Sequence, residues 1–491
     1  MPTRNSTSTP QGSLDAGAMG TADIVFFVLA GVAPMGVSVA WLPLAIALGN
    51  GPGAAGTYLI AGVILALFSV GYVRMSRRIA NVGGFYIFAR EGLGRRAGGA
   101  TAYVALLAYN AATIGIFGSF AYFSSHVFTE LLGTPVPWQL SASVGFVIVA
   151  VLSYFEVTTS AKVLGVALVA EVLTLLGLDA AILIERGFKG FSLEVFEPSV
   201  VLGSGFGVSL MFAFGSFVGF EATALYGEEA RNPRRSVPRA TYISLTVITV
   251  FYLLTTWAAI SATGVDHAQS ATKADPENYI FDVSTDLLGQ GYTEIMGILV
   301  MTSLFAAFLA FHFSTSRYHV ALARDGLLPQ SMARIHPKHG SPVTAGAWQL
   351  GLLVLTTCGF TLAGQHPYLG MSISLFGLGV LGIVLLQGIA AVSIVGFFLR
   401  LHHRQDESIV GALVSPGLGA LGLVGGLVLM IDNYSTLTGT STTWVNALPW
   451  ALPAAAAIGA VAAGRWRITA TDEEDKVGGT TLHAAKAPMP E

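Results

Sequence analysis

Two acidic residues and one histidine interrupt long apolar stretches of this chain: Glu171, Glu221 and His312. If such stretches cross a bilayer, Glu171 lies about 16 Å from one end, near the middle of a ~30 Å hydrocarbon core. A charge at that depth costs several kcal/mol, so an ionisable group there is by default a functional candidate. The Glu171 carboxyl can carry a proton or ligate a cation. The alternative is a structural hydrogen bond from a protonated carboxyl to a neighbouring helix.

The other polar candidates also have structural alternatives. Glu221 follows a glycine-bracketed segment, where a carboxylate can act on a ligand or simply cap a helix N-terminus. His312 can relay protons at ordinary pH, or make a satisfied bond between helices. Ser314 and Thr315 follow it, and hydroxyl oxygens suit a hard cation. We expect these five residues to include the group that couples an ion, H+ or alternatively Na+, to function.

The composition places these groups in a membrane. Of 491 residues, 53% are hydrophobic and only 11% are charged, against about 25% charged in soluble domains. The single cysteine, Cys358, excludes a disulfide scaffold, and the net charge of -3 argues against a nucleic-acid partner. The sequence contains no GxxxxGK[ST] loop and no cluster of metal ligands. We therefore expect no enzyme activity, no metal and no cofactor, and a small molecule and membrane lipid as partners.

Apolar runs predict an all-α polytopic membrane protein with twelve transmembrane helices, because open strand edges cannot lie in lipid. The runs cover residues 22–48, 54–73, 98–127, 138–155, 160–184, 205–227, 241–262, 292–316, 343–363, 371–399, 411–430 and 445–464. The first run is too long for a signal peptide and has no convincing cleavage site, so we expect it to be retained.

Lysine and arginine residues orient the bundle. With the N-terminus in the cytoplasm, 22 of the 25 basic residues fall on the inner side and three, Arg186, Lys189 and Lys273, on the outer side. This positive-inside bias predicts both termini in the cytoplasm and a plasma (inner) membrane location. Residues 1–20 are expected to form a disordered cytoplasmic segment, and residues 465–491 a cytoplasmic tail.

Two apolar runs contain helix breaks at corresponding positions. The first run holds residues 33–36 (APMG) and the sixth holds 215–219 (GSFVG). Similar segments, 86–88 and 279–281 (both YIF), follow spans two and seven on opposite membrane sides. The pattern favours inverted repeats that open with discontinuous helices, over a lone proline kink and packing of small residues. Unwound segments free backbone N–H groups that suit a carboxylate, and carbonyl groups that suit an ammonium.

Three longer stretches resemble the amino acid–polyamine–organocation (APC) superfamily of amino acid permeases. They are residues 81–94 (NVGGFYIFAREGLG), residues 216–221 (SFVGFE) with 228–238 (EEARNPRRSVP), and residues 323–329 (ARDGLLP). They bracket spans one to nine, so the resemblance covers most of the chain. It implies a LeuT-like 5+5 inverted repeat with helices 1 and 6 discontinuous. The first repeat would cover about 21–185, the second about 204–400, and helices 11 and 12 about 410–464.

The resemblance also implies a site. In place of the family's Gly-Ser-Gly trio the chain has Gly36, Val37 and Ser38, and the amides around Val37 and Ser38 are expected to face a substrate carboxylate. Ser314 and Thr315 match cation-ligand positions of sodium-coupled members, and Glu171 falls where several proton-coupled relatives have a lysine. The backbone of span six would receive an amine, and Tyr109 would partner Glu221. Independently of the resemblance, we expect Phe220, which adjoins the break, and Phe311 to close over the substrate as gates. The predicted substrate site comprises Ala33, Pro34, Gly36, Val37, Ser38, Tyr109, Ser216, Phe217, Val218, Gly219, Phe220 and Phe311.

These observations predict a secondary active transporter that imports an amino acid by proton symport and alternating access. One alternative is a polyamine or organic-cation carrier, or an antiporter, of the same fold, because Glu171 and Glu221 suit extra positive charge. Another is a ligand sensor that does not transport. A channel would require a continuous polar face, and the sequence has none.

Overall fold

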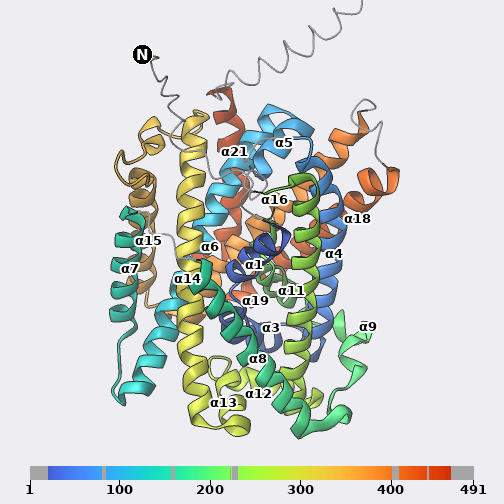
Figure 1. Cartoon of the computed structure of the whole chain (residues 1–491), viewed down its shortest axis with the longest axis vertical. Helices are drawn as coiled ribbons and strands as arrows, with labels where there is room; N and C mark the ends of the chain where they lie inside the picture. Colours follow the sequence, from blue (N-terminus) through green and yellow to red (C-terminus); the bar gives the residue numbers. More distant parts are fainter. Residues whose placement is uncertain are drawn as a thin grey trace, which may run out of the picture.

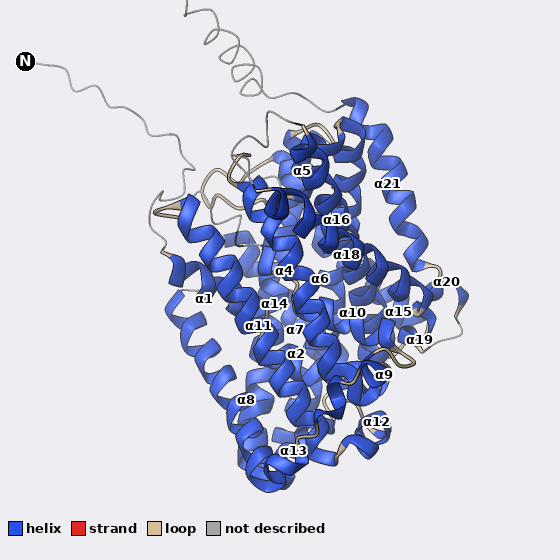
Figure 2. Ribbon diagram, turned by 90° about the vertical axis from the view of Figure 1, so that its right-hand side faces the viewer, coloured by secondary structure: helices blue, strands red, loops and turns tan. Residues whose placement is uncertain are grey.

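The computed structural model describes residues 20–79, 84–155, 161–221, 223, 230–400, 408–439 and 442–465. Within these residues the chain consists of helices joined by turns and loops, without a β-strand (Figure 1 and Figure 2). The predicted all-α class is therefore confirmed. The predicted N-terminal segment and most of the predicted C-terminal tail lie outside the described residues.

Ten helical stretches in the described part are long and apolar enough to cross a membrane. They contain α1 and α2 (Thr21–Gly31 and Pro34–Ala40), α4 (Ala54–Ser76), α6 (Arg95–Leu132), α7 (Trp138–Phe155), α8 (Ala161–Gly190), α11 (Pro233–Thr263), α14 (Gln290–Arg324), α15 (Val343–Leu362), α16 (Ile373–Leu399) and α18 (Ser415–Asp432). Two shorter apolar helices are α10 (Phe206–Ser216), in the first half of the run predicted as span six, and α21 (Ala451–Ala462), in the run predicted as span twelve. Residues 222 and 224–227 of the predicted span six lie outside the described residues.

Short helices cover the ends of the bundle. They are α3 (Leu42–Ala47), α5 (Phe85–Leu93), α9 (Pro198–Val201), α12 (Val265–Ala274), α13 (Tyr279–Leu288), α19 (Tyr434–Thr438) and α20 (Thr443–Asn446). Helix α5 lies at one end of the molecule, while α12 and α13 lie at the other (Figure 1).

Helices α5 and α13 share a local design at opposite ends of the bundle. Each begins next to a Tyr-Ile-Phe segment and ends at a glycine with positive φ, Gly94 (φ 101°) or Gly289 (φ 84°). Such a φ is available to glycine at little steric cost, so the chain can turn directly into the next long helix. These next helices are α6 and α14. The short sequence similarity between residues 86–88 and 279–281 therefore corresponds to two similar helix–turn–helix units.

The centre of the bundle is the contact between α6 and α16. A Cβ atom added to Gly115 of α6 would lie 2.5 Å from the backbone nitrogen of Phe376, and one added to Gly379 of α16 would lie 2.7 Å from Ala112. Small residues let helix backbones approach this closely inside a membrane, where van der Waals packing drives association. The close approach explains why α6, although it spans the whole molecule, is buried along most of its apolar length.

The predicted first span, residues 22–48, is interrupted twice rather than once. Besides the break before Pro34, the helix is broken at Trp41 (φ −117°), and α3 begins at Leu42 with Pro43 at its second position. Proline has no N–H to donate to the preceding turn, which accounts for the second interruption. The Trp41 ring stacks on Phe376 at 3.8 Å between ring centroids, so this corner is held against α16.

Candidate substrate and coupling site

The first helix break is a single strained residue. Helix α1 ends at Gly31 and α2 begins at Pro34; between them Ala33 has φ 53°, the one positive φ at a non-glycine among the described residues. Pro34 disfavours helical geometry at Ala33, and a left-handed alanine costs about 1–2 kcal/mol. Contacts around the break must offset this cost, which suggests that the broken geometry serves a purpose.

The second break follows α10 and faces the first. Helix α10 ends at Ser216, and the chain then turns through Phe217 and Val218 to Gly219, whose φ is 111°. A Cβ on Gly219 would lie 4.0 Å from the carbonyl oxygen of Gly31, so the two broken segments are neighbours in space. The structure therefore brings together the two glycine-containing segments that the sequence singled out.

Two tyrosines of α4 hold the second break at both ends. The Tyr58 hydroxyl is 3.1 Å from Ser216 Oγ, and the Tyr72 hydroxyl donates to the Glu221 carbonyl oxygen at 2.9 Å. Neither tyrosine was among the predicted site residues. They are 14 residues apart, close to four helical turns and thus on one helix face, so helical spacing was a signal that could have found them.

Glu171 binds the start of α2. Its Oε2 accepts hydrogen bonds from the Met35 amide at 3.2 Å and from the Ser303 hydroxyl at 2.9 Å. Ser303 Oγ in turn accepts the Gly36 amide at 3.2 Å. Glu171 is only 5% exposed, so this contact lies inside the bundle. A carboxylate at a helix N-terminus is favoured both by the free amides and by the helix dipole.

The amides predicted to face a substrate carboxylate differ in what they contact. The Val37 N–H donates to the Ala33 carbonyl oxygen at 3.0 Å, within α2. The Met35 and Gly36 amides, two residues earlier, are those that meet Glu171 and Ser303. Ser38 is fully buried, and its Oγ has no hydrogen-bond partner among the described residues. The anion-binding end of α2 is therefore already occupied by a carboxylate of the protein itself.

Glu221 and Tyr109 meet beside the second break. Glu221 Oε2 accepts the Gly219 amide at 3.0 Å, and the Tyr109 hydroxyl donates to Oε1 at 3.5 Å. The first contact is a local hydrogen bond to the backbone of the turn, and the second is the pairing expected from the resemblance. Of the gate candidates, Phe220 is fully buried with its ring edge-on to Phe68, while Phe311 of α14 is half-buried.

The candidates in α14 do not gather at the breaks. His312 Nε2 lies 2.9 Å from Ser153 Oγ of α7, which is the interhelical bond considered as its alternative. Thr315 Oγ1 is 3.3 Å from Thr113 Oγ1, whereas Ser314 is exposed. Successive helical residues point about 100° apart, so Ser314 and Thr315 face different surroundings.

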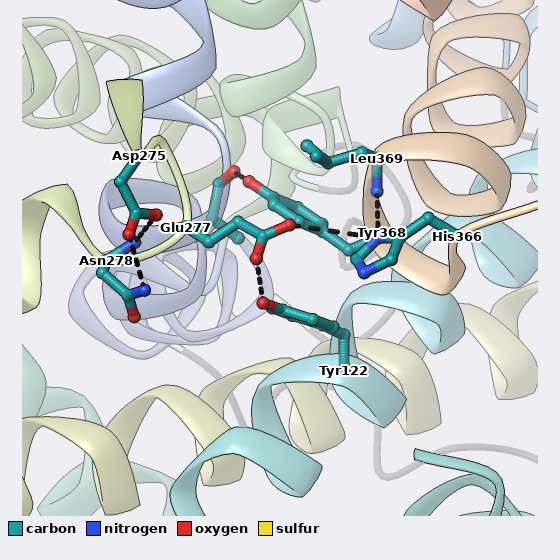
Figure 3. Close-up of polar contacts among 8 residues, drawn as sticks. Tyr122, Asp275, Glu277, Asn278, His366, Tyr368 and Leu369 are labelled. Atoms are coloured by element: carbon teal, nitrogen blue, oxygen red, sulfur yellow. Dashed lines mark hydrogen bonds and ion pairs between the residues drawn. The ribbon is translucent and has the colours of Figure 1, made fainter. Parts of the chain in front are cut away.

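A polar cluster closes the opposite end of α2 (Figure 3). Glu277, in the loop between α12 and α13, accepts the hydroxyl hydrogen bond of Tyr122 from α6, and its Oε1 is 3.9 Å from His366 Nδ1. Tyr368 stacks on Tyr122 at 5.4 Å between centroids and donates to the Ala40 carbonyl oxygen at the end of α2. These contacts join the loop between α12 and α13, helix α6 and the residues just before α16 at this end of α2. This contact was not predicted from the sequence.

Most of the chain matches one known protein family. The family model "Amino acid permease" matches residues 23–362, which include both breaks, Glu171 and Glu221. The chain belongs to the amino acid permease family. This family lies within the APC superfamily, as the resemblance indicated, and its members are membrane transporters rather than enzymes. The protein is therefore a multi-pass membrane permease.

Several characterised relatives are similar over much of their length. The branched-chain amino acid permease BcaP of Bacillus subtilis is 24% identical over 419 residues, covering 82% of this chain and 84% of the relative. The methylthioribose transporter of the same organism is 23% identical with the same coverage. Cationic amino acid transporter 4 of Homo sapiens is 26% identical over 327 residues, 62% of this chain and 49% of the relative.

Proposed function

We propose that this permease is a secondary active transporter that imports an amino acid by proton symport and alternating access. We further propose the LeuT-like arrangement of twelve helices, with α10 and the turn after it as helix 6 and α21 as helix 12. Two observations support the arrangement: the facing breaks near Ala33 and Gly219, and the similar α5–α6 and α13–α14 units at opposite ends. We propose a plasma membrane location and cytoplasmic termini from the distribution of basic residues.

The contact between Glu171 and the Met35 amide carries the coupling proposal. A substrate carboxylate requires the same N-terminal end of α2 that Glu171 now occupies. Substrate entry would take the Met35 amide away from the Glu171 carboxylate, and a buried carboxyl that loses a hydrogen-bond donor is more stable when protonated. Substrate and proton would then be bound together and released together, which is symport.

The remaining site residues have roles consistent with a zwitterion. Backbone carbonyl groups at the end of α10, around Ser216 to Val218, would accept the substrate ammonium, because a helix C-terminus carries partial negative charge. Tyr109 and Glu221 adjoin this end of the site. The named substrates of the relatives include branched-chain and cationic amino acids, so both classes belong in a substrate panel.

Among the alternatives, a polyamine or organic-cation carrier draws support from the two buried acids near the breaks, Glu171 and Glu221. Sodium coupling draws less support, because exposed Ser314 and buried Thr315 do not converge on one point.

Uptake into proteoliposomes tests these functions against one another. We expect labelled amino acids to accumulate in the vesicles when an inwardly directed proton gradient is imposed. A sodium gradient alone should not cause accumulation. Accumulation of polyamines but not amino acids would favour the organic-cation carrier. Uptake that follows sodium and ignores pH would contradict the role of Glu171. Binding without accumulation under either gradient would favour a sensor.

Replacing Ser303 by Ala tests the local geometry. The change removes a donor from Glu171 and the acceptor of the Gly36 amide, at an expected cost of about 1–3 kcal/mol in the free energy of unfolding. We expect the midpoint of thermal unfolding of purified protein to fall by several degrees. Ser314→Ala, on the same helix but exposed, is the matched control and should leave it unchanged. Equal effects of the two changes would contradict the proposed contact.

A further inference from the structure

A second site lies where α6 and α21 come together at the end of the bundle that also carries α5 (Figure 1). Arg95, Arg96, Ala460, Val461, Ala463 and Gly464 line a pocket of about 650 Å³ there, which we call the Arg95–Arg96 pocket. The two helices are in backbone contact beneath it: a Cβ on Gly99 would lie 2.4 Å from the Gly459 carbonyl oxygen. The floor of the pocket is therefore a rigid helix crossing.

One side of the pocket is basic. Arg95 and Arg96 are the first two residues of α6, and both are exposed. Arg95 Nη2 donates to the Gly464 carbonyl oxygen at 3.4 Å, which orients this guanidinium over the end of α21. The preceding residue, Gly94, has no side chain to cap the first amides of α6. Two guanidinium groups therefore line the pocket beside a helix N-terminus, and both features favour an anion.

The other side of the pocket is apolar. Ala460 and Val461 belong to α21, and Val461 is 82% exposed on the outer surface of this apolar helix. In a membrane protein such a surface faces lipid chains. Among the described residues, Arg74, Arg90 and Arg324 lie in the last turns of α4, α5 and α14, at this same end of the bundle. The positive-inside rule places such an end at the cytoplasmic leaflet.

We propose that the Arg95–Arg96 pocket binds the phosphate of an anionic phospholipid from the inner leaflet, with an acyl chain along Ala460 and Val461. A phosphate oxygen accepts the paired N–H donors of an arginine, and basic pockets between transmembrane helices on the cytoplasmic side recognise such headgroups. A soluble phosphate would use the arginines but not the apolar wall. The combination selects a lipid, which would join α6 to α21 at their crossing.

Thermal unfolding of the whole protein in a nonionic detergent tests the proposal. Added phosphatidylglycerol is expected to raise the unfolding midpoint, because a ligand that binds only the folded state stabilises it. In the Arg95→Gln/Arg96→Gln double variant, the lipid concentration for half of the effect should rise about 25-fold, since each basic residue contributes about 1 kcal/mol. Arg234→Gln/Arg235→Gln is the matched control: these adjacent, exposed arginines also begin a helix, α11, and should not change the response.

Each other outcome would overturn the proposal. Equal stabilisation by phosphatidylcholine would mean that the negative charge is not recognised. Equal stabilisation by inorganic phosphate would assign the pocket to a soluble anion. Equal losses in the two double variants would indicate a general effect of surface charge. If the Arg95→Gln/Arg96→Gln protein does not fold, the Val461→Asn variant tests the proposal instead. This variant should weaken the stabilisation by phosphatidylglycerol. Unchanged stabilisation would contradict the acyl-chain contact.

Discussion

Glu171→Gln is expected to abolish the accumulation of substrate that a proton gradient drives, while leaving exchange of substrate across the membrane intact. Glutamine has the same shape, and its carbonyl oxygen can still accept the Met35 and Ser303 hydrogen bonds, so the fold should survive. It cannot take up a proton. With one proton per substrate, a gradient of one pH unit supports about tenfold accumulation, and this ratio should fall to one in the variant.

The measurement is the ratio of internal to external labelled substrate in proteoliposomes at steady state, with counterflow exchange as the test of folding. Asp179→Asn is the matched control. Asp179 lies in the same helix as Glu171, but its carboxylate accepts a hydrogen bond from Thr255 of α11 at 2.9 Å and does not contact α2 in the described structure. The control should keep its accumulation ratio. Retained proton-driven accumulation in Glu171→Gln would refute the coupling proposal.

Gly379→Val is expected to have the largest effect on folding. Its Cβ would lie 2.7 Å from both the nitrogen and the Cβ of Ala112, closer than such atoms can approach, and the neighbour is helix backbone that cannot rotate away. Overpacking of this kind costs about 1–3 kcal/mol even where side chains can yield. We expect a loss of most monodisperse protein on size-exclusion chromatography, and a lower unfolding midpoint for what remains.

Gly425→Val provides the control for this prediction. Gly425 lies in α18, is exposed, and has nothing within 4 Å of an added Cβ. The same substitution there changes helix propensity in the same way but meets no neighbouring helix. Similar yields for the two variants would show that the α6–α16 contact is looser than the structure indicates.

The helix ends beside Pro34 and Gly219 could be predicted because they depend on local chemistry. Pro34 has no N–H to donate to the preceding turn, and Gly219 permits a positive φ, so each residue weakens the helix in its own segment wherever that helix lies. The motifs around 81–94, 216–238 and 323–329 similarly pointed to the correct family. The second interruption at Trp41 was missed, although Pro43 was its local signal.

The partners of the polar residues could not be predicted in the same way. Ser303 carries no signal in the sequence, yet it lies between Glu171 and the Gly36 amide. Nothing in the order of residues indicates that His312 meets Ser153, or that Ser314 is exposed while Thr315 is buried. These facts depend on how each helix is rotated about its axis, and on which helices cross at a given depth.

By itself, the sequence determined that the chain is helical, that it is built for a membrane, which family it belongs to and that helices end beside Pro34 and before Gly219. Only the tertiary structure decided that Glu171 occupies the anion-binding end of α2. The physical reason is that lipid and protein core are both apolar, so in a membrane the apolar pattern that reveals the buried face of a soluble helix is largely absent. The contact between residues 171 and 35, separated by 136 positions, arises only once the helices have packed.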